Sequence, residues 1–173
     1  KNYSGIYSAY FITLKRGRSR KRSEADYMKS LSKNSKDVFI KIIIEMGEKQ
    51  LMKLQAQHFL PLTIELLDVG IDTVLGKANN YSFCNYYDFN CDLMQSPEMC
   101  FLVIGDCSVE KRGYLGKVNI IPYMFQYADI GLYECSIIIS HKRIVQVKEQ
   151  MQIRHTQLAE QWLQEIKTIG YLK

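Results

Sequence analysis

The sequence predicts a single α+β domain spanning residues 1–173, made mainly of antiparallel sheet packed by helices, with a long amphipathic helix at the C-terminus. Three observations predict this class. The length and the 47% hydrophobic content are those of one globular domain. Between Leu62 and Ser140, short apolar runs alternate with Gly, Pro, Asn and Asp, which is typical of antiparallel strands. After Lys142, apolar residues recur at three- and four-residue steps, which is typical of a helix.

The first part of the chain is predicted to hold a strand, an exposed loop and a short helix. Residues 6–14 are rich in aromatic and β-branched side chains, which favours a strand. The basic loop Lys15–Arg22 follows directly. Ser23 and the acids just after it match a helix start, because a serine hydroxyl accepts unpaired amides and acids oppose the helix dipole. We therefore expect a helix from Ser23 to about Ser32.

A second helix is expected from Asp37 to His58, weakened at Gly47 and ended by Pro61. Apolar residues recur at helical spacing, and Asp37 is a candidate cap, although residues 38–44 also fit a buried strand. The predicted strand runs then follow as Leu62–Val69, Asp72–Leu75, Tyr81–Phe89, Cys100–Ile104, Val118–Ile121 and Gly131–Ser140.

The last helix, Lys142 to Ile169, is predicted to end at Gly170. Its apolar stripe is formed by Ile144, Val147, Met151, Leu158, Trp162, Ile166 and Ile169. The stripe fits a face that packs on the sheet. A partner-binding face is the alternative, because Trp162 is the only tryptophan and tryptophan is enriched in interfaces.

Positive charge is concentrated in one short stretch. The net charge is +5, yet the 22 residues from Lys15 to Lys36 carry +7. The centre of this stretch contains six basic residues, and like charges at this density require exposure to solvent; they are Lys15, Arg16, Arg18, Arg20, Lys21 and Arg22. Such a loop is suited to an anionic membrane surface or to the phosphates of RNA, and its composition is also that of a nuclear-import signal. A merely solvated loop is the alternative.

Chemistry-bearing motifs are not apparent, and we predict neither an enzyme nor a cofactor. His58, His141 and His155 are scattered, and the chain lacks a nucleophile elbow and a phosphate-binding glycine loop. Cys135 lies in a predicted strand, where a core thiol is the expected occupant. The acidic pairs Glu45/Glu48 and Glu160/Glu165 are interpreted as solvated helix faces. Four other cysteines lack the close spacing of a zinc knuckle, so we expect no metal site and free, buried thiols.

Tyrosine is abundant, with twelve residues, of which seven fall in two clusters: Tyr81, Tyr86 and Tyr87, and Tyr114, Tyr123, Tyr127 and Tyr133. Tyrosine suits contact surfaces because its ring is large and its conformational entropy is low. Tyr127 and Tyr133, together with Trp162, are therefore candidate interface residues. Half-buried positions in a twisted sheet would explain the tyrosines equally well.

The order of parts resembles that of rhabdovirus matrix proteins. The nearest likeness is residues 126–137, Gln-Tyr-Ala-Asp-Ile-Gly-Leu-Tyr-Glu-Cys-Ser-Ile, which look like the family segment in which Ile-Gly-Leu-Tyr begins a long strand. Residues 10–14, followed by a basic turn and a helix, are similar in layout. These matches cover about a third of the chain, and the Pro-Pro-x-Tyr motif of that family is absent.

The resemblance implies a structural protein of the virion that self-associates and bridges a viral nucleoprotein or nucleocapsid to the inner face of an anionic membrane. The basic loop would contact lipid headgroups, nucleoprotein or RNA. Such a protein would be found in the virion and in the host cytoplasm, with nuclear entry as a further expectation. A nucleic-acid-binding or nuclear-targeted regulatory domain is the alternative function.

Overall fold

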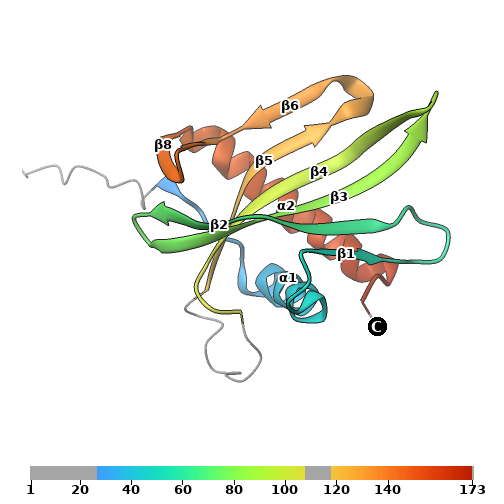
Figure 1. The fold of residues 1–173 in the computed structure, drawn as a ribbon, viewed down its shortest axis with the longest axis horizontal. Helices are drawn as coiled ribbons and strands as arrows, with labels where there is room; N and C mark the ends of the chain where they lie inside the picture. The colour runs from blue at the N-terminus through green and yellow to red at the C-terminus, as the bar shows by residue number, and fades with distance from the viewer. Residues whose placement is uncertain (1–26, 108–117, 173) are drawn as a thin grey trace, which may run out of the picture.

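The computed structural model describes residues 27–107 and 118–172, in which an antiparallel sheet is packed by two helices (Figure 1). The basic loop Lys15–Arg22 and the predicted strand 6–14 lie outside the described residues. The described helices are α1 (Lys33–Met46) and α2 (Glu149–Ile169), and a 3₁₀ turn, η3, covers Ala128–Ile130. The described strands are β1 (Leu51–Leu54), β2 (Leu62–Thr73), β3 (Gly76–Phe89), β4 (Asp92–Ile104), β5 (Asn119–Tyr127), β6 (Leu132–Cys135), β7 (Ile137–Ser140) and β8 (Arg143–Val147).

The eight strands form one sheet in the order β6-β5-β4-β3-β2-β8-β7, with β1 also paired to β2. All these pairs are antiparallel except the short contact between β2 and β8. Antiparallel neighbours need only tight connections, which explains the turn residues that separate the apolar runs. The predicted α+β class, with its antiparallel sheet and C-terminal helix, is therefore confirmed.

Strands β6 and β7 follow each other almost without interruption and are separated by Ser136 alone. The Ser136 amide donates to Tyr123 O of β5 at 2.8 Å, whereas the Ser136 carbonyl accepts from the Lys148 amide just after β8 at 2.7 Å. The strand thus changes partner at this residue. As a result, β7 and β8 turn across one side of the sheet.

Two hydrophobic clusters lie on the two faces of the sheet. On the helix face, α1 and α2 pack against β3 and β4, and Phe39 stacks on Phe83 at 4.7 Å between ring centroids. On the opposite face, Ile137 and other β7–β8 side chains pack against Leu102 and Ile121. Burying each aromatic ring contributes about 2–3 kcal/mol of hydrophobic free energy, so both faces are needed to stabilise the sheet.

The strap, residues 27–32, connects these two faces before α1 begins. Met28 belongs to the cluster on the opposite face, and Leu31 belongs to the cluster on the helix face. Between them, Ser30 Oγ accepts from the Ile120 amide at 2.9 Å, and the Leu31 amide donates to Ile120 O at 2.9 Å. The strap therefore crosses the sheet at a part of β5 that β6 leaves unpaired.

The structure corrects several expected boundaries. Of the predicted helix Ser23–Ser32, residues 28–32 lack helical structure, because Ser32 instead caps α1 through its side chain. The helix expected over Asp37–His58 begins at Lys33 and ends at Gly47, where φ is +60°, and β1 follows.

The C-terminal helix was predicted to begin at Lys142, but it begins at Glu149. The preceding apolar residues, including Ile144 and Val147, form β8, because strand pairing with β7 outweighs their helical spacing. Among the thiols expected to be buried, Cys91 is exposed, since it occupies the β3–β4 turn with a φ of +69°.

Candidate functional site

One side of α2 binds the strap through polar side chains spaced four residues apart. Gln152, Thr156 and Glu160 lie one above another on the helix, since residues at i and i+4 share a face. Each of them hydrogen-bonds a residue between Lys29 and Ser35. This polar ladder fixes the position of the backbone that follows the basic loop in the sequence.

Gln152 makes the most complete contact of the ladder. Its Oε1 accepts from the Lys29 amide at 2.9 Å, and its Nε2 donates to Lys29 O at 2.9 Å. The same Nε2 approaches Pro122 O at 3.2 Å, on β5. The side chain is fully buried, so removing it would leave several backbone groups without a partner.

Glu160 holds the start of α1. Its carboxylate accepts from the Ser32 hydroxyl at 2.6 Å, from the Ser32 amide and from the Ser35 hydroxyl. Burial acts to raise the pKa of Glu160, but the hydrogen bonds from Ser32 and Ser35 lower it more, and the net pKa lies below the usual value. The expectation that Glu160 belongs to a solvated face is therefore wrong.

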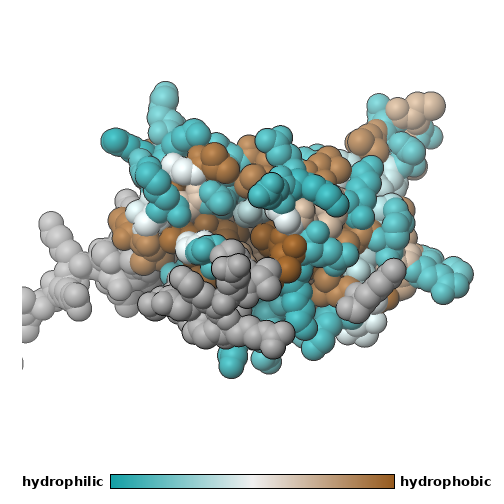
Figure 2. Space-filling model, turned by 60° about the horizontal axis from the view of Figure 1, so that its bottom comes forward, coloured by the Kyte–Doolittle hydropathy of each residue, from teal (hydrophilic) through white to brown (hydrophobic). Residues whose placement is uncertain are grey.

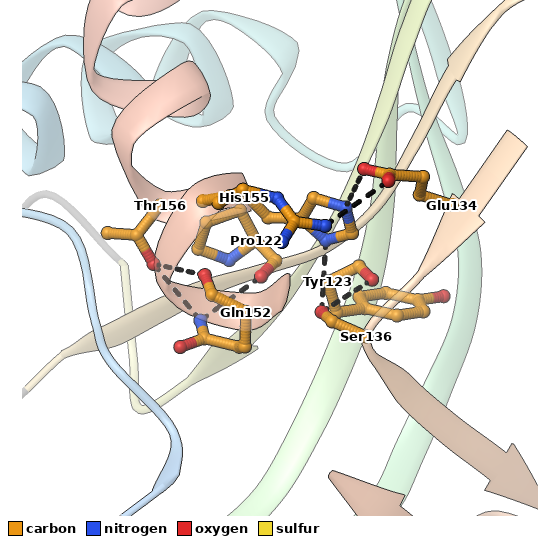
Figure 3. Close-up of polar contacts among 8 residues, drawn as sticks. Pro122, Tyr123, Glu134, Ser136, Gln152, His155 and Thr156 are labelled. Atoms are coloured by element: carbon orange, nitrogen blue, oxygen red, sulfur yellow. Dashed lines mark hydrogen bonds and ion pairs between the residues drawn. The ribbon is translucent and has the colours of Figure 1, made fainter. Parts of the chain in front are cut away.

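On another side of α2, His155 is completely buried between β5 and β6 (Figure 3). Its Nδ1 lies 3.0 Å from Ser136 Oγ, which in turn donates to Tyr123 O at 2.9 Å. Its Nε2 lies 3.4 Å from Glu134 Oε2, without hydrogen-bond geometry. Arg154 also approaches Glu134, at 3.3 Å.

Two proton arrangements fit these distances. In a protonated His155, Nδ1–H donates to Ser136 and Nε2–H faces Glu134, while the Ser136 hydroxyl donates to Tyr123 O. In a neutral His155, the Ser136 hydroxyl can instead rotate to donate to Nδ1. Burial lowers the pKa of His155, and Glu134 only partly offsets this effect, so the neutral form is favoured near neutral pH.

Serine, histidine and glutamate together have the composition of a hydrolase triad. A nucleophilic serine must be reached by its substrate, however, and Ser136 has no exposed surface. Its hydroxyl lies at the bend between β6 and β7 and links this bend to α2. We therefore assign Ser136, His155 and Glu134 to a structural junction.

The opposite face carries a second polar arrangement away from β7 and β8. Cross-strand partners point to the same face, and residues two apart on a strand do too. The strand registers accordingly place two adjacent rows side by side: Thr63, Cys84, Glu98, Gln126 and Tyr133 in the first, and Glu65, Ser82, Cys100, Met124 and Cys135 in the second. We call these ten residues the polar rows.

Glu98 lies at the centre of the polar rows and is only 8% exposed. Ser82 Oγ donates to Glu98 Oε1 at 2.6 Å. Burial, and then the nearby Glu98 charge, raise the pKa of Cys84 to about 12. Within the described residues, no Lys, Arg or His lies within ion-pair distance of Glu98. A nearly buried carboxylate without a cation is costly, which marks this place as unusual.

Asn80 gives a second sign of unmet polarity on this face. It lies two residues before Ser82 on β3 and is 8% exposed. Its side chain acts to lower the pKa of the Tyr123 phenol, against the larger raising effect of burial, yet its Oδ1 has no hydrogen-bond partner within the described part of the chain. Buried polar atoms normally find a partner. The partnerless Oδ1 of Asn80 and the Glu98 carboxylate, which no cation of the described residues pairs, are two separate features of this face that favour a binding role.

The candidate interface residues do not gather at one site. Tyr133 lies in the polar rows and is 64% exposed. Tyr127 follows Gln126, the strand partner of Tyr133, so it lies on the other face of the sheet, where it contacts Phe125. Trp162 packs partly against the cluster on the helix face. The basic residues Lys15, Arg16, Arg18, Arg20, Lys21 and Arg22 lie outside the described residues.

The described residues contain no group of three or more His, Cys, Asp or Glu arranged to hold a metal ion. No described helix is long and apolar enough to cross a membrane. In the view of Figure 2, hydrophobic side chains occur in small groups separated by hydrophilic ones. The surface seen there therefore does not offer one dominant apolar patch.

Residues 37–172 match the model of a protein family described as a domain of unknown function, DUF6908. The chain belongs to this family. No curated protein and no solved structure matches the chain.

The match to the DUF6908 domain extends from α1 to the end of α2 and so includes the polar ladder, the His155 junction and the polar rows. The basic loop and the strap precede it. Sequence inspection missed the ladder, although Gln152, Thr156 and Glu160 share a four-residue spacing that could have identified it.

Proposed function

We propose that this DUF6908 protein is a non-catalytic structural protein that binds an anionic membrane surface through Lys15–Arg22 and self-associates through its folded domain. The charge distribution carries the proposal. The described residues contain twelve Lys and Arg against fifteen Asp and Glu, a net charge of −3. Six basic residues lie within the eight positions 15–22. Attraction to an anionic surface thus depends on this loop, since the domain itself would be repelled.

The polar ladder supports the same function. It anchors Lys29 and Ser32, within ten residues of Arg22, to α2 through five hydrogen bonds: two are donated by Gln152 and Thr156, and three are accepted by Gln152 and Glu160. Because the strap is fixed to the domain, binding of the basic loop to a membrane would also hold the domain at that membrane. The short chain between them limits the distance between the domain and the surface to tens of ångströms.

Exposed apolar side chains at one end of the sheet support self-association. Phe89 and Leu93 flank the β3–β4 turn and are 58% and 65% exposed, and Ile130 of η3 is 72% exposed. Asp129 joins the two hairpins by accepting from Ser96 Oγ at 2.8 Å and from the Tyr87 hydroxyl. These side chains fit an isologous contact with a second copy of the chain. The further role of a nucleocapsid bridge is supported only by the resemblance at residues 126–137.

Vesicle sedimentation tests the membrane part of the proposal. The full chain is expected to bind vesicles containing phosphatidylserine at low salt and to lose them at high salt. A variant with Arg16, Arg18, Arg20, Lys21 and Arg22 changed to Ser should lose roughly a thousandfold in affinity, since five basic residues at about 1 kcal/mol each contribute about 5 kcal/mol. Its far-UV circular dichroism spectrum should match that of the wild-type chain, which shows that the domain is still folded.

The matched control removes the same charge elsewhere, with Lys41, Lys49, Lys53, Lys77 and Lys167 changed to Ser, all exposed residues of the described domain. Equal losses in the two variants would refute a specific role for the loop.

RNA added as a competitor distinguishes membrane binding from the alternative function, nucleic-acid binding. A chain that ignores vesicles and binds RNA with a steep salt dependence is a nucleic-acid-binding domain instead.

Sedimentation velocity tests self-association. A Phe89→Ser, Leu93→Ser double variant should remain monomeric at concentrations where the wild-type chain forms dimers or larger species. Leu51→Ser with Val145→Ser, two other exposed apolar residues, is the control. A wild-type chain that is monomeric both free and on vesicles would exclude the self-association part.

A further inference from the structure

The strap brings the start of the described chain to the same face as the polar rows. Met28 is 6% exposed and belongs to the same cluster as Cys100 and Met124, two members of the second row. Leu31, three residues later, already lies on the helix face. The chain therefore enters the domain on the opposite face, in a hydrophobic cluster that includes two members of the second row.

We propose that the polar rows bind the chain's own basic loop, Lys15–Arg22, and so hold it away from anionic surfaces until those surfaces compete for it. This inference rests on the proposed function and names its regulation. The occupant follows from charge: Glu65 and Glu98 lie two strands apart and two residues offset along them, about 12 Å, and no Lys, Arg or His of the described residues forms an ion pair with either.

The charge census of the rows agrees with a cationic occupant. Their ionisable members are two carboxylates, three thiols and one phenol. Burial raises the pKa of Cys84 and Cys100, so these thiols stay neutral at pH 7. Two basic residues of the described chain stand at the ends of the rows. Lys53 is paired with Thr63 at one end, three strands from Glu98, and Lys148 lies near Cys135 at the other.

Hydrogen-bonding capacity also fits. A guanidinium or ammonium group donates several N–H bonds and accepts none. The face offers acceptors in the two carboxylates, in the partnerless Oδ1 of Asn80 and in the Gln95 and Gln126 amides, which already bond each other at 3.1 Å. An arginine reaching Glu98 would supply the charge-assisted bond that the carboxylate lacks.

The loop is long enough to reach this face. Arg22 lies six positions before Met28, and an extended chain spans at most about 3.6 Å per position, or about 20 Å. Glu98 lies on the same strand as Cys100, which belongs to the Met28 cluster. The basic residues nearest the strap, Arg20 to Arg22, can therefore contact the polar rows within one molecule.

Limited trypsin digestion of the full chain tests the contact without any membrane. Trypsin needs an extended, unbound segment, so a bound loop should be cut slowly. Glu65→Gln with Glu98→Gln should raise the cleavage rate within residues 15–22 at least threefold. Glu45→Gln with Glu48→Gln removes two carboxylates around the end of α1 and should leave the rate unchanged. In wild type, 0.5 M NaCl should raise the rate to that of the first variant, because salt screens the pairs.

The single variant Glu65→Gln controls for misfolding of the double variant. It leaves the nearly enclosed Glu98 in place and changes only the half-buried Glu65. It should give an intermediate rate at an unchanged melting temperature. Equal rates in wild type and in both Glu variants would overturn the proposal. Protection that grows with protein concentration would also overturn it, since the occupant would then be the loop of a second copy.

Vesicle binding separates this proposal from the function on which it rests. Release of the loop should make Glu65→Gln with Glu98→Gln bind phosphatidylserine vesicles at least threefold more tightly than wild type. If neither protein binds vesicles but the trypsin difference holds, the membrane function fails and the internal contact stands. If both bind equally and the trypsin rates are equal, the membrane function stands and the internal contact fails.

Discussion

The two faces of the sheet are buried differently: the helix face mainly by apolar side chains, and the opposite face by a hydrophobic cluster together with the polar rows. On the helix face, Phe39, Phe83 and Phe101 form an aromatic cluster between α1 and the strands. On the opposite face, the polar rows bury Ser82 and Glu98 to below 10% exposure. Apolar burial stabilises a fold, whereas polar burial costs free energy unless it is matched by partners. The difference separates residues kept for stability from residues that fit a binding role.

The largest effect on the free energy of unfolding is expected from disrupting the packing of the helix face. Phe39→Ala should destabilise the domain by about 3–5 kcal/mol, because it leaves a cavity in a fully buried aromatic cluster. Tyr133→Ala in the polar rows should change the free energy of unfolding by less than about 0.5 kcal/mol, since the ring is mostly exposed. Urea denaturation measures both. Similar losses would mean that the two faces contribute equally to stability.

The next effect concerns the strap that joins the faces. Gln152→Ala should cost about 1–3 kcal/mol, because the Lys29 amide and the Pro122 carbonyl lose their side-chain partner in a buried place. Hydrogen exchange at the Lys29 amide should accelerate with it. Gln157→Ala, exposed one turn further along α2, is the control and should change neither quantity. An unchanged exchange rate at Lys29 would show that the ladder does not hold the strap.

The sequence predicted the helix face better than the polar parts. Apolar periodicity located α2 and its end at Gly170, and the alternation of short apolar runs located most strands. The stripe predicted for α2 included Leu158, which is 37% exposed, whereas the buried side includes Gln152, His155 and Thr156. Hydropathy assigns such residues to solvent. Their burial depends on hydrogen bonds to the strap and to Ser136, which are distant in sequence.

The polar rows could not be found from the sequence for a different reason. A row exists only if five strands are in register, and β-bulges shift the register between Cys84 and Tyr86 and between Cys100 and Phe101. Glu65 and Glu98 are 33 positions apart and carry no motif. The basic loop was visible because its six charges are contiguous.

A smaller effect is expected where the ladder meets α1. The pKa of folded Glu160 lies below its unfolded value, so its contribution to stability is complete above about pH 4.5 and is lost as the pH falls through the folded pKa. Glu160→Gln should therefore be less stable than wild type at pH 7, and the difference should shrink at low pH. Thermal melting from pH 3 to pH 7 measures this. The exposed Glu165→Gln is the control, and a difference that persists at low pH would contradict the assignment.

The smallest effect concerns His155, where the polar and apolar sides of α2 meet. Burial lowers the pKa of folded His155 below the unfolded value of about 6.5, so the unfolded chain binds the proton more readily. Stability should be complete above pH 6.5 and should decrease as the pH falls below it, until the folded histidine is also protonated. The loss should be small because Ser136 can redirect its hydroxyl to Tyr123 O and because Glu134 faces the new charge. Glu134→Gln should lower the pKa of His155 further, measured by NMR titration of the ring, and an unchanged pKa would mean that Glu134 does not act on the buried histidine.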